Sequence, residues 1–536
     1  IGACIGREFG HDLLAAVSPM ERRRLGDALQ QLIDSALIYV SGAAPVETYT
    51  FKHALVQDTA YESLLKSDRA AFHRRIAEAL ESTFPHIVEA NPEIPARHYS
   101  SAGQAVRAVP HWLAAGQLAI ESFAYAEAVS FLKQALSLLD QIPSSDMRDR
   151  TELTLQTLLG VCGVNLAGWG SADVVAAFGR AGALLDKAEK AMDSIPVLVT
   201  IGMNEWVGGS FAKCDRMLRE ALDVAEQADE QELSHVVRLL YGCGCFHMAR
   251  SDVSDELLSG GIDTYDPNRH RALGIRIVGQ DLYPVSLAYL GLSKAWLGYL
   301  DQSWSYQQRA AEAARADTHP NTRANGLSMA ASGAVLCGRW QEGVAWSDEC
   351  IAFCEAQQLP VWLGYSKLAR GYGRSMLGEV EAGINDITSA NAFLQSIAAT
   401  EANGWAQTFL ADIYIRTGKF DEAESGVQGL LAHYRRTGEE MARHFHSCLA
   451  PALDIARHGA DATDGETMLI EGLALARNRN FRLDELRLAT LYAHLRVEQG
   501  RPDDARDILE PVYGWFREGF RSPFLTQAKS LLDELG

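Results

Sequence analysis

The sequence has few prolines and no long apolar run. Its 536 residues include only 16 prolines, so long helices can form with few interruptions. No apolar stretch approaches the roughly 18 residues that a membrane-spanning helix needs. Basic residues are also scarce, since 49 Lys and Arg against 69 Asp and Glu give a net charge of −20. This balance argues against a general nucleic-acid binder and against adhesion to anionic membranes, so we expect neither partner.

Motifs of nucleotide chemistry are absent as well. Gly333 and Gly338 have the spacing of a phosphate loop, but Arg-Trp follows them in place of the lysine and the Ser/Thr. Gly371 and Gly373 form a short glycine motif that no expected strand precedes. We therefore expect no enzyme activity, no catalytic residue and no cofactor in this chain.

The nine cysteines are an odd number scattered over a large chain. Reduced thiols in a cytoplasmic protein are the expected state. Cys243 and Cys245, and likewise Cys350 and Cys354, stand close together, but nothing nearby supplies the other two ligands of a zinc site. Because several of these positions coincide with small packing positions of a repeat, we expect buried, unreactive thiols.

A second candidate for metal binding lies further along the chain. Glu440 and His444 are one helical turn apart, and His446 is close by. Acidic and imidazole side chains are common on exposed helix faces without a metal. We therefore expect no metal site.

Glycines recur along the chain at a steady interval, the sign of a repeat architecture. Intervals of 40 or 41 residues separate Gly298, Gly338, Gly378, Gly418, Gly459 and Gly500. Gly168 and Gly209 are also 41 residues apart, and Arg250 holds the next position. A glycine at such a position ends one helix in a left-handed turn before an antiparallel second helix.

Small residues flank these turns, usually seven positions before and five after. Gly371 and Gly383 do so around Gly378, and Ala411 and Ala423 around Gly418. Small side chains let two antiparallel helices approach closely. The interval alone would also admit HEAT-type repeats, but this spacing favours a tetratricopeptide-like pair stretched to about 40 residues.

Counted from Trp112, about ten helix pairs cover residues 103–536. Stacked pairs build a curved superhelix with a long concave surface. Residues 260–268 widen one interval to 48 residues and predict a loop insertion.

The first hundred residues have a different pattern. Two helices are expected over residues 8–17 and 20–36, then two short strands over 37–40 and 47–51 around Gly42 and Pro45. A further helix is expected from His53 onward. This order predicts a winged-helix-like module over residues 1–68, and residues 69–102 form a helical bridge. The fold class is thus all-α, a helical-repeat superhelix behind a small module with one β-hairpin.

Several segments resemble one group of large bacterial signalling proteins. These segments are Phe51–Asp58 (FKHALVQD), Ile5–Phe9 (IGREF), Tyr61–Leu65 (YESLL), Tyr265–Arg271 and Leu509–Phe520. They are similar to the region after the ATPase core of proteins that combine a class III adenylate/guanylate cyclase-like domain, a STAND-type AAA ATPase module and a tetratricopeptide array. The chain opens on Ile1 without an initiator methionine, so we expect it to be part of a longer polypeptide.

The resemblance implies a role for His53. In STAND ATPases a histidine at the strand-to-helix junction of the winged helix contacts the phosphate of bound ADP. Lys52 and Ala54 replace the methionine and the aspartate of the usual Met-His-Asp signature, so the motif is only partly present. ATP or ADP and Mg²⁺ are expected only with an upstream ATPase module, which would be an intramolecular partner of this chain.

The concave surface is the expected binding site for a protein, a peptide or a small effector. The tetratricopeptide register places mixed aromatic and charged residues there, a combination that suits a peptide ligand. These candidates are Tyr365, Tyr372, Trp405, Asp412, His446, Arg487 and His494. The expected function is a sensor and relay region of a signalling ATPase. The alternatives are a free-standing scaffold and a transcription regulator that uses the winged helix, whose second helix carries Arg22, Arg23 and Arg24.

Overall fold

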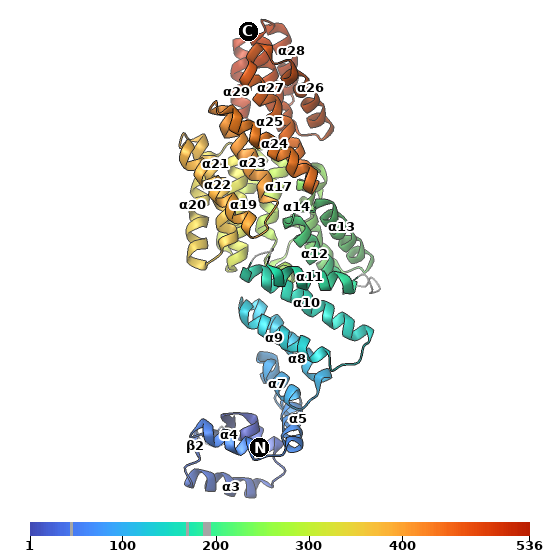
Figure 1. Cartoon of the computed structure of the whole chain (residues 1–536), viewed down its shortest axis with the longest axis vertical. Helices are drawn as coiled ribbons and strands as arrows, with labels where there is room; N and C mark the ends of the chain where they lie inside the picture. The colour runs from blue at the N-terminus through green and yellow to red at the C-terminus, as the bar shows by residue number, and fades with distance from the viewer. Residues whose placement is uncertain (43–46, 168–170, 186–193) are drawn as a thin grey trace. The chain divides into compact units, whose positions relative to one another are not determined.

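The computed structural model describes residues 1–42, 47–166, 171–185 and 194–536, together with the backbone of residue 167 (Figure 1). The chain divides into two compact units, Ile1–Cys162 and Gly163–Gly536. Pro45 and Gly168, which the sequence analysis assigned to turns, lie outside the described residues.

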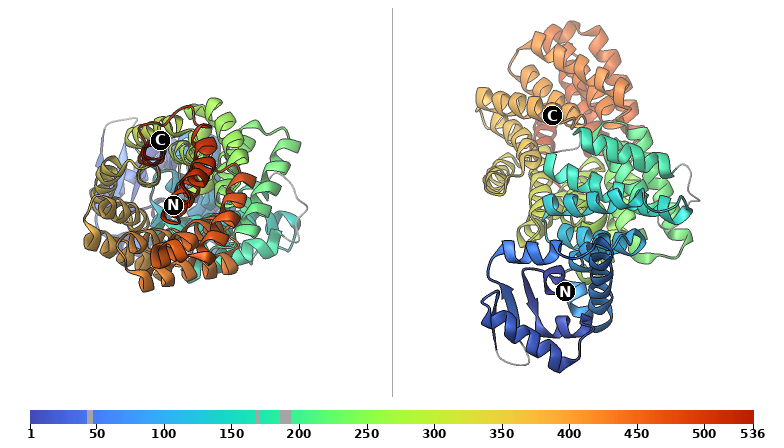
Figure 2. Two further views of the ribbon diagram at one scale, coloured as in Figure 1. Left: turned by 90° about the horizontal axis from the view of Figure 1, so that it is seen from above. Right: turned by 60° about the horizontal axis from the view of Figure 1, so that its bottom comes forward.

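The N-terminal unit begins with a small mixed module (Figure 2, right). Its elements are α1 (Gly2–Ile5), β1 (Glu8–Gly10), α2 (His11–Val17), α3 (Arg22–Asp34), β2 (Ile38–Ser41), β3 (Thr48–Phe51) and α4 (Ala54–Glu62). The strands form an antiparallel sheet in the order β1-β3-β2, in which Tyr49 pairs with both Phe9 and Val40. Leu14, Leu25 and Leu29 pack with Phe9 and Tyr49 in the core of the module.

One expectation for this module was wrong. Residues 8–10 were expected to begin a helix, but they form β1, so the sheet has three strands rather than a single hairpin. The reason is tertiary: pairing with β3 buries Phe9, whose ring stacks on Tyr49 with centroids 5.7 Å apart. Burial of this aromatic pair outweighs the local helical preference.

Helices fill the rest of the N-terminal unit. They are α5 (Lys66–Thr83), α6 (Pro85–Ala90), α7 (Glu93–Ser101), α8 (Ala105–Glu121), α9 (Tyr125–Leu139) and the greater part of α10 (Asp146–Ala167). Helices α8 and α9 pack against each other along their lengths. Gly116 permits their close contact, since a Cβ there would lie 2.7 Å from Leu132 Cδ2.

The second unit consists of helices among its described residues. They are α11 (Ala172–Leu185), α12 (Ile195–Val207), α13 (Phe211–Gln227), α14 (Gln231–His247), α15 (Ser251–Asp263), α16 (Pro267–Val278), α17 (Tyr283–Trp296), α18 (Leu300–Ala316), α19 (Pro320–Leu336), α20 (Trp340–Gln357), α21 (Pro360–Met376), α22 (Val380–Ser396), α23 (Ala402–Arg416), α24 (Phe420–Thr437), α25 (Glu440–His458), the short η2 (Gly459–Asp461), α26 (Thr463–Asn478), α27 (Arg482–Glu498), α28 (Pro502–Tyr513) and α29 (Pro523–Glu534). Within the described residues, no helix is both long and apolar enough to cross a membrane.

The turn glycines behave as the spacing predicted. Gly298, Gly338, Gly378 and Gly418 follow the first helix of a pair with φ angles of 93°, 80°, 99° and 71°. At the position assigned to Arg250, the preceding Ala249 takes the left-handed conformation instead, with φ of 52°. Helices α17, α19, α21 and α23 contact one another in succession and form a continuous wall. The predicted fold class, a tetratricopeptide-like superhelix behind a small module, is therefore confirmed.

The expected loop insertion at residues 260–268 is a helical insertion. Residues 260–263 complete α15, and after a short break an additional helix, α16, begins at Pro267. The side chain of Asp266 accepts a hydrogen bond of 2.9 Å from the backbone N of Asn268 and so caps α16. Such an N-cap, followed by proline in the first turn, is a strong helix start that the loop interpretation missed.

The second unit also has contacts between repeats that are far apart in the sequence. Trp296 Nε1 donates to Asp484 Oδ2 at 2.8 Å, across 188 residues of sequence. Arg479 donates to the carbonyl oxygen of Met248 at 3.0 Å, across 231 residues. The backbone N of Thr400 donates to the carbonyl oxygen of Val207 at 2.9 Å. Repeats far apart in sequence are thereby held together, beyond the neighbour contacts of a simple solenoid.

Candidate functional site

The second unit contains a partly open cavity of about 310 Å³, within the size range of small-molecule sites. Helices α10, α12, α14, α16, α17, α19, α21, α22 and α23 contribute to its lining. Most of the lining is apolar, and aromatic side chains are frequent. The aromatic side chains that line it are Trp206, Tyr289, Trp362, Tyr365, Phe393, Trp405 and Phe409.

Helical spacing brings these side chains to one place. Trp362 and Tyr365 lie three residues apart on α21, and their ring centroids are 5.8 Å apart. Glu401 immediately precedes α23, and Trp405 lies four residues later on the same helix. Residues three or four apart share one helix face, so the two members of each pair face the cavity together.

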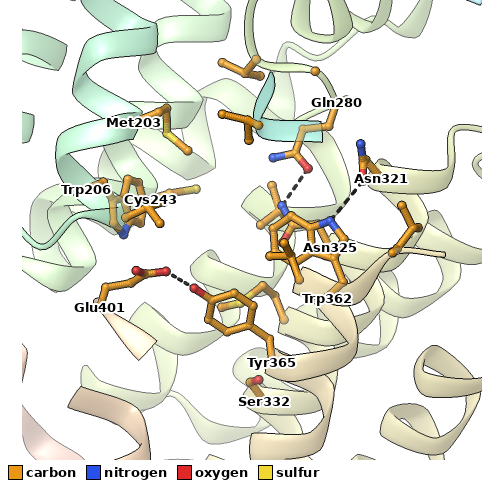
Figure 3. Close-up of a pocket in the computed structure, with 18 of the residues that line it drawn as sticks. Met203, Trp206, Cys243, Gln280, Asn321, Asn325, Ser332, Trp362, Tyr365 and Glu401 are labelled. Atoms are coloured by element: carbon orange, nitrogen blue, oxygen red, sulfur yellow. Dashed lines mark hydrogen bonds between the residues drawn. The ribbon is translucent and has the colours of Figure 1, made fainter. Parts of the chain in front are cut away.

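Amide side chains gather at one end of the cavity (Figure 3). Asn325 Nδ2 donates to Gln280 Oε1 at 2.8 Å. Trp362 Nε1 donates to Asn321 Oδ1 at 3.3 Å, and Asn321 Nδ2 donates to Asn165 Oδ1. These bonds orient amide groups that offer both donors and acceptors to a ligand.

A buried carboxyl group lies at another part of the wall. Glu401 is 6% exposed, and the Tyr365 hydroxyl donates a hydrogen bond to its Oε1. The second oxygen, Oε2, is buried without a hydrogen-bond partner among the described residues. Burial raises the pKa of this carboxyl to about 8, with a smaller contribution from the charge of Glu439. The group is therefore mostly protonated at neutral pH while the cavity is empty.

A buried network of hydrogen-bonded polar side chains lies next to the cavity. His247, itself part of the cavity lining, has Nδ1 2.8 Å from Glu439 Oε1 and Nε2 3.0 Å from the Tyr289 hydroxyl. His433 Nε2 lies 2.8 Å from Glu439 Oε2. Burial by itself would raise the pKa of the Glu439 carboxyl, but the hydrogen bonds from His247 and His433 outweigh it and lower the pKa below its ordinary value. The Glu439 carboxyl is therefore ionised at neutral pH, whereas the Glu401 carboxyl is mostly protonated.

The structure brings two of the surface candidates into the cavity. Tyr365 and Trp405 both line it. Tyr372, Asp412 and Arg487 meet instead around a second cavity of about 30 Å³, where the Tyr372 hydroxyl donates to Asp412 Oδ2 at 2.8 Å. That space holds about one water molecule.

The remaining predicted residues lie elsewhere. His446 is half-buried on α25 and His494 is exposed on α27, and neither lines the two cavities. His53 is exposed at the junction of β3 and α4, where it is the residue before the helix. Its position at a strand-to-helix junction agrees with the sequence analysis, and its contact with a nucleotide stays a prediction.

The metal candidates do not converge as a set. Glu440 accepts a hydrogen bond of 2.6 Å from Arg479, whereas His444 lies 2.7 Å from Asp484. His444, Asp484 and Cys448 are close together, but Arg487 donates to Asp484 at 3.2 Å. A guanidinium beside the carboxylate opposes a bound cation, so this cluster is better explained as a hydrogen-bonded network.

The cysteine pairs are buried, as the sequence analysis expected. Cys243, Cys245, Cys350 and Cys354 are all buried free thiols. Burial raises the pKa of Cys243 to about 12 and of Cys245 to about 11. A thiol with such a pKa is a poor nucleophile at neutral pH.

Sequence analysis missed most of the polar groups of the cavity. Glu401, Gln280 and Asn325 come from three separate repeats, and none of them stands in a recognisable sequence motif. Only Tyr365 and Trp405 were found, because the repeat register assigns them to the inner helix face. The others needed the superhelical curvature, which local patterns do not encode.

Comparisons with known proteins give distant similarities. No family model matches the chain. A curated, uncharacterised protein of Rhizobium meliloti (strain 1021) is 22% identical over 452 residues, which are 84% of this chain and 44% of that protein. The chain therefore spans less than half the length of this relative.

Several solved structures have similar helical arrangements. A Rap protein in complex with competence and sporulation factor is 12% identical, with 80% of this chain and 99% of that chain covered and a TM-score of 0.42. A signal transduction ATPase with numerous domains (STAND) and a tetratricopeptide-repeat sensor, from Pyrococcus horikoshii, is 10% identical over 74% of this chain and 62% of that chain, with a TM-score of 0.35. Yeast Tom70 is 11% identical over 86% and 96% of the two chains, with a TM-score of 0.32. The similarity concerns helical architecture at low sequence identity.

Proposed function

We propose that this chain is the non-catalytic sensor and relay region of a multidomain signalling protein, and that an effector binds in the cavity of the second unit. The observation that carries the proposal is the cavity itself, which combines apolar and aromatic walls with a few oriented polar groups. A core that only stabilised the fold would be packed without such a space. Lining of this kind is typical of a ligand site.

The location of the cavity suggests how binding would be relayed. Its wall includes Trp206 and Val207 at the end of α12 and Glu401 at the start of α23. These segments already touch through the hydrogen bond between Thr400 and Val207. A ligand that contacts both segments stabilises one packing of the superhelical turns over another. This differential affinity is what shifts a conformational equilibrium.

The remainder of the proposal concerns the longer polypeptide. The sequence resemblance suggests an upstream STAND-type ATPase, with a winged-helix role for residues 1–68 and a phosphate contact for His53. ATP or ADP with Mg²⁺ would then bind upstream and not in this chain. Purified residues 1–536 should hydrolyse no ATP and make no cyclic nucleotide, and turnover in either assay would overturn this assignment.

Effector binding is tested by filling the cavity. N-phenyl-1-naphthylamine is a neutral apolar dye that fluoresces in apolar surroundings, and it should titrate the chain saturably at one site. Ser332 lines the cavity, so Ser332→Trp should weaken this binding at least about tenfold, equivalent to about 1.4 kcal/mol. The control is Ser396→Trp on the exposed face of α22. Equal dye binding by both variants contradicts the proposal.

DNA binding is a second candidate with one supporting observation. Arg22, Arg23 and Arg24 are exposed in the first turn of α3, where they could contact phosphates. Titration of the whole chain with a labelled duplex at two salt concentrations tests it. Affinity that falls steeply with salt supports the alternative, and its absence removes it.

A further inference from the structure

The ionisable side chains of the cavity lining limit the kind of ligand that can bind there. Among the described residues that line it, Glu401 is the only acid, and no lysine or arginine is present. Among these described lining residues, His247 is the one side chain that can become a cation, and it is already hydrogen-bonded to Glu439. An anionic ligand would therefore meet a carboxyl group and find no free basic partner. Burial of an unpaired anion is costly, so the lining disfavours carboxylates and phosphates.

Glu401 has an oxygen in need of a partner. Its Oε1 accepts from Tyr365, while Oε2 is buried with no hydrogen-bond partner in the described part of the chain. Buried polar atoms are nearly always satisfied in folded proteins. Once the carboxyl group is ionised, this oxygen can only accept, and an N–H group of a ligand would supply the missing donor.

Aromatic rings surround the same part of the cavity. In Figure 3 the indole of Trp206 lies beside Glu401, with Tyr365 on the other side of the carboxyl group. Trp405 lies one helical turn after Glu401, and the ring of Tyr289 is 6.0 Å from that of Trp206. Electron-rich ring faces next to a carboxylate are the arrangement that binds organic ammonium ions.

We infer that the cavity binds a small apolar molecule that carries a protonated amine, with the ammonium group at Glu401 Oε2 among the rings of Trp206, Tyr289, Tyr365 and Trp405. This inference rests on the proposed function, because it assigns a ligand class to the same cavity. The amides of Gln280, Asn321 and Asn325 would then take a polar group at the other end of the ligand. The net charge of −20 also favours the approach of cations.

Binding of the amine is coupled to loss of a proton. The pKa of Glu401 is about 8 in the empty cavity, so at neutral pH the carboxyl group must release its proton to solvent before it pairs with the ammonium. The titratable groups that face it are Tyr365 on α21, Tyr289 on α17, and the pair formed by His247 on α14 and Glu439 before α25. Glu439 is ionised and hydrogen-bonded to two histidines, which leaves Glu401 as the group that changes charge.

The test uses three ligands with one apolar body: 4-phenylbutylamine, 4-phenylbutanol and 4-phenylbutyrate. Calorimetric titration of the whole chain at about pH 9 should show the amine binding at least about tenfold more tightly than the alcohol, and the carboxylate binding most weakly. At about pH 6.5 the ionised fraction of a group with this pKa is roughly 30-fold smaller, so amine affinity should fall by about that factor. The affinity for the alcohol should change little.

Glu401→Gln should reduce the affinity for the amine to that for the alcohol. The matched control is Glu355→Gln on the exposed face of α20, which makes the same change in net charge far from the proposed contact. Should Glu401→Gln not fold, calorimetry of the unmodified chain in buffers of different ionisation enthalpy still decides, because amine binding at about pH 7 should release close to one proton.

The inference is overturned when the alcohol binds as tightly as the amine, when the carboxylate binds best, when no proton is released, or when the amine does not bind. None of these results bears on the cavity as an effector site, which the dye titration with Ser332→Trp decides independently.

Discussion

His247 Nδ1 and Glu439 Oε1 lie 2.8 Å apart although 192 residues separate them in the sequence. The side chains are about 2% exposed, and the second oxygen of Glu439 binds His433. An ionised carboxylate only accepts hydrogen bonds, so both imidazoles donate to it. This interaction joins α14 to the segment before α25 and closes the superhelix beside the cavity.

Glu439→Ala should therefore be strongly destabilising. It leaves two buried imidazoles without their acceptor, and loss of one member of a buried charged network typically costs roughly 3–5 kcal/mol. Urea unfolding followed by circular dichroism measures the change. Glu422→Gln, on the exposed face of α24, is the control and should stay within about 0.5 kcal/mol of the unmodified chain.

The pair of His247 and Glu439 also predicts how the folding stability changes at acid pH. The pKa of Glu439 in the folded chain lies below its ordinary value of 4.5, so its stabilising contribution is present above that value. The contribution disappears as the pH falls through the folded-state pKa. The stability difference between the unmodified chain and Glu439→Ala should accordingly shrink below about pH 4.5, and a constant difference across the acid range would contradict the network.

Glu401 has the opposite pH dependence. Its pKa in the folded chain is about 8, above the ordinary value of 4.5, so between these values the folded state binds more protons than the unfolded state. Folding stability must then decrease as the pH rises through this window, by up to about 1.4 kcal/mol per pH unit. Glu401→Gln removes this dependence and should gain stability relative to the unmodified chain from about pH 5 to about pH 8.5. Parallel stability curves for the two proteins would show that Glu401 is not the buried, protonated group described above.

The repeat could be predicted from the sequence because its determinants are local. Gly378 and Gly418 end helices through their own backbone conformation, and the small residues around them act on the adjacent helix. Strand β1 could not be found in this way. Its three residues become a strand through pairing with β3, 38 residues or more along the chain.

The cavity depended on longer-range geometry. The repeat register assigned Tyr365 and Trp405 to the concave inner face, and in the structure both line the cavity. It could not place Glu401 against Val207, because that contact joins repeats whose residues are 194 positions apart in the sequence. Curvature accumulates from small rotations between repeats, so the sequence of one repeat does not predict the total curvature of the superhelix.

The packing of the repeat predicts a contrast between two glycines. A Cβ at Gly371 on α21 would lie 2.6 Å from the carbonyl oxygen of Gly383 and 2.7 Å from Ile387 Cγ1 on α22. Gly371→Ala should therefore push these helices apart and cost roughly 1–3 kcal/mol. Gly260 on α15 has no atom within 4 Å of such a Cβ, and Gly260→Ala should instead stabilise by roughly 0.5–1 kcal/mol. Denaturant unfolding of both variants compares them, and equal effects would contradict the close approach of α21 and α22.

The cluster of His444, Cys448 and Asp484 provides the last prediction, on metal binding. Asp484 Oδ2 already accepts from Trp296 and lies 2.7 Å from His444 Nε2, and Oδ1 accepts from Arg487. Since its hydrogen-bond partners occupy both oxygens, a Zn²⁺ ion would have to displace donors and lie next to a guanidinium. Added Zn²⁺ or EDTA should therefore leave the melting temperature unchanged. Asp484→Ala should lower the stability by roughly 3–5 kcal/mol with or without the metal, because Trp296, His444 and Arg487 lose a shared acceptor. A zinc-dependent rise in the melting temperature of the unmodified chain that Asp484→Ala abolishes would instead identify the cluster as a metal site.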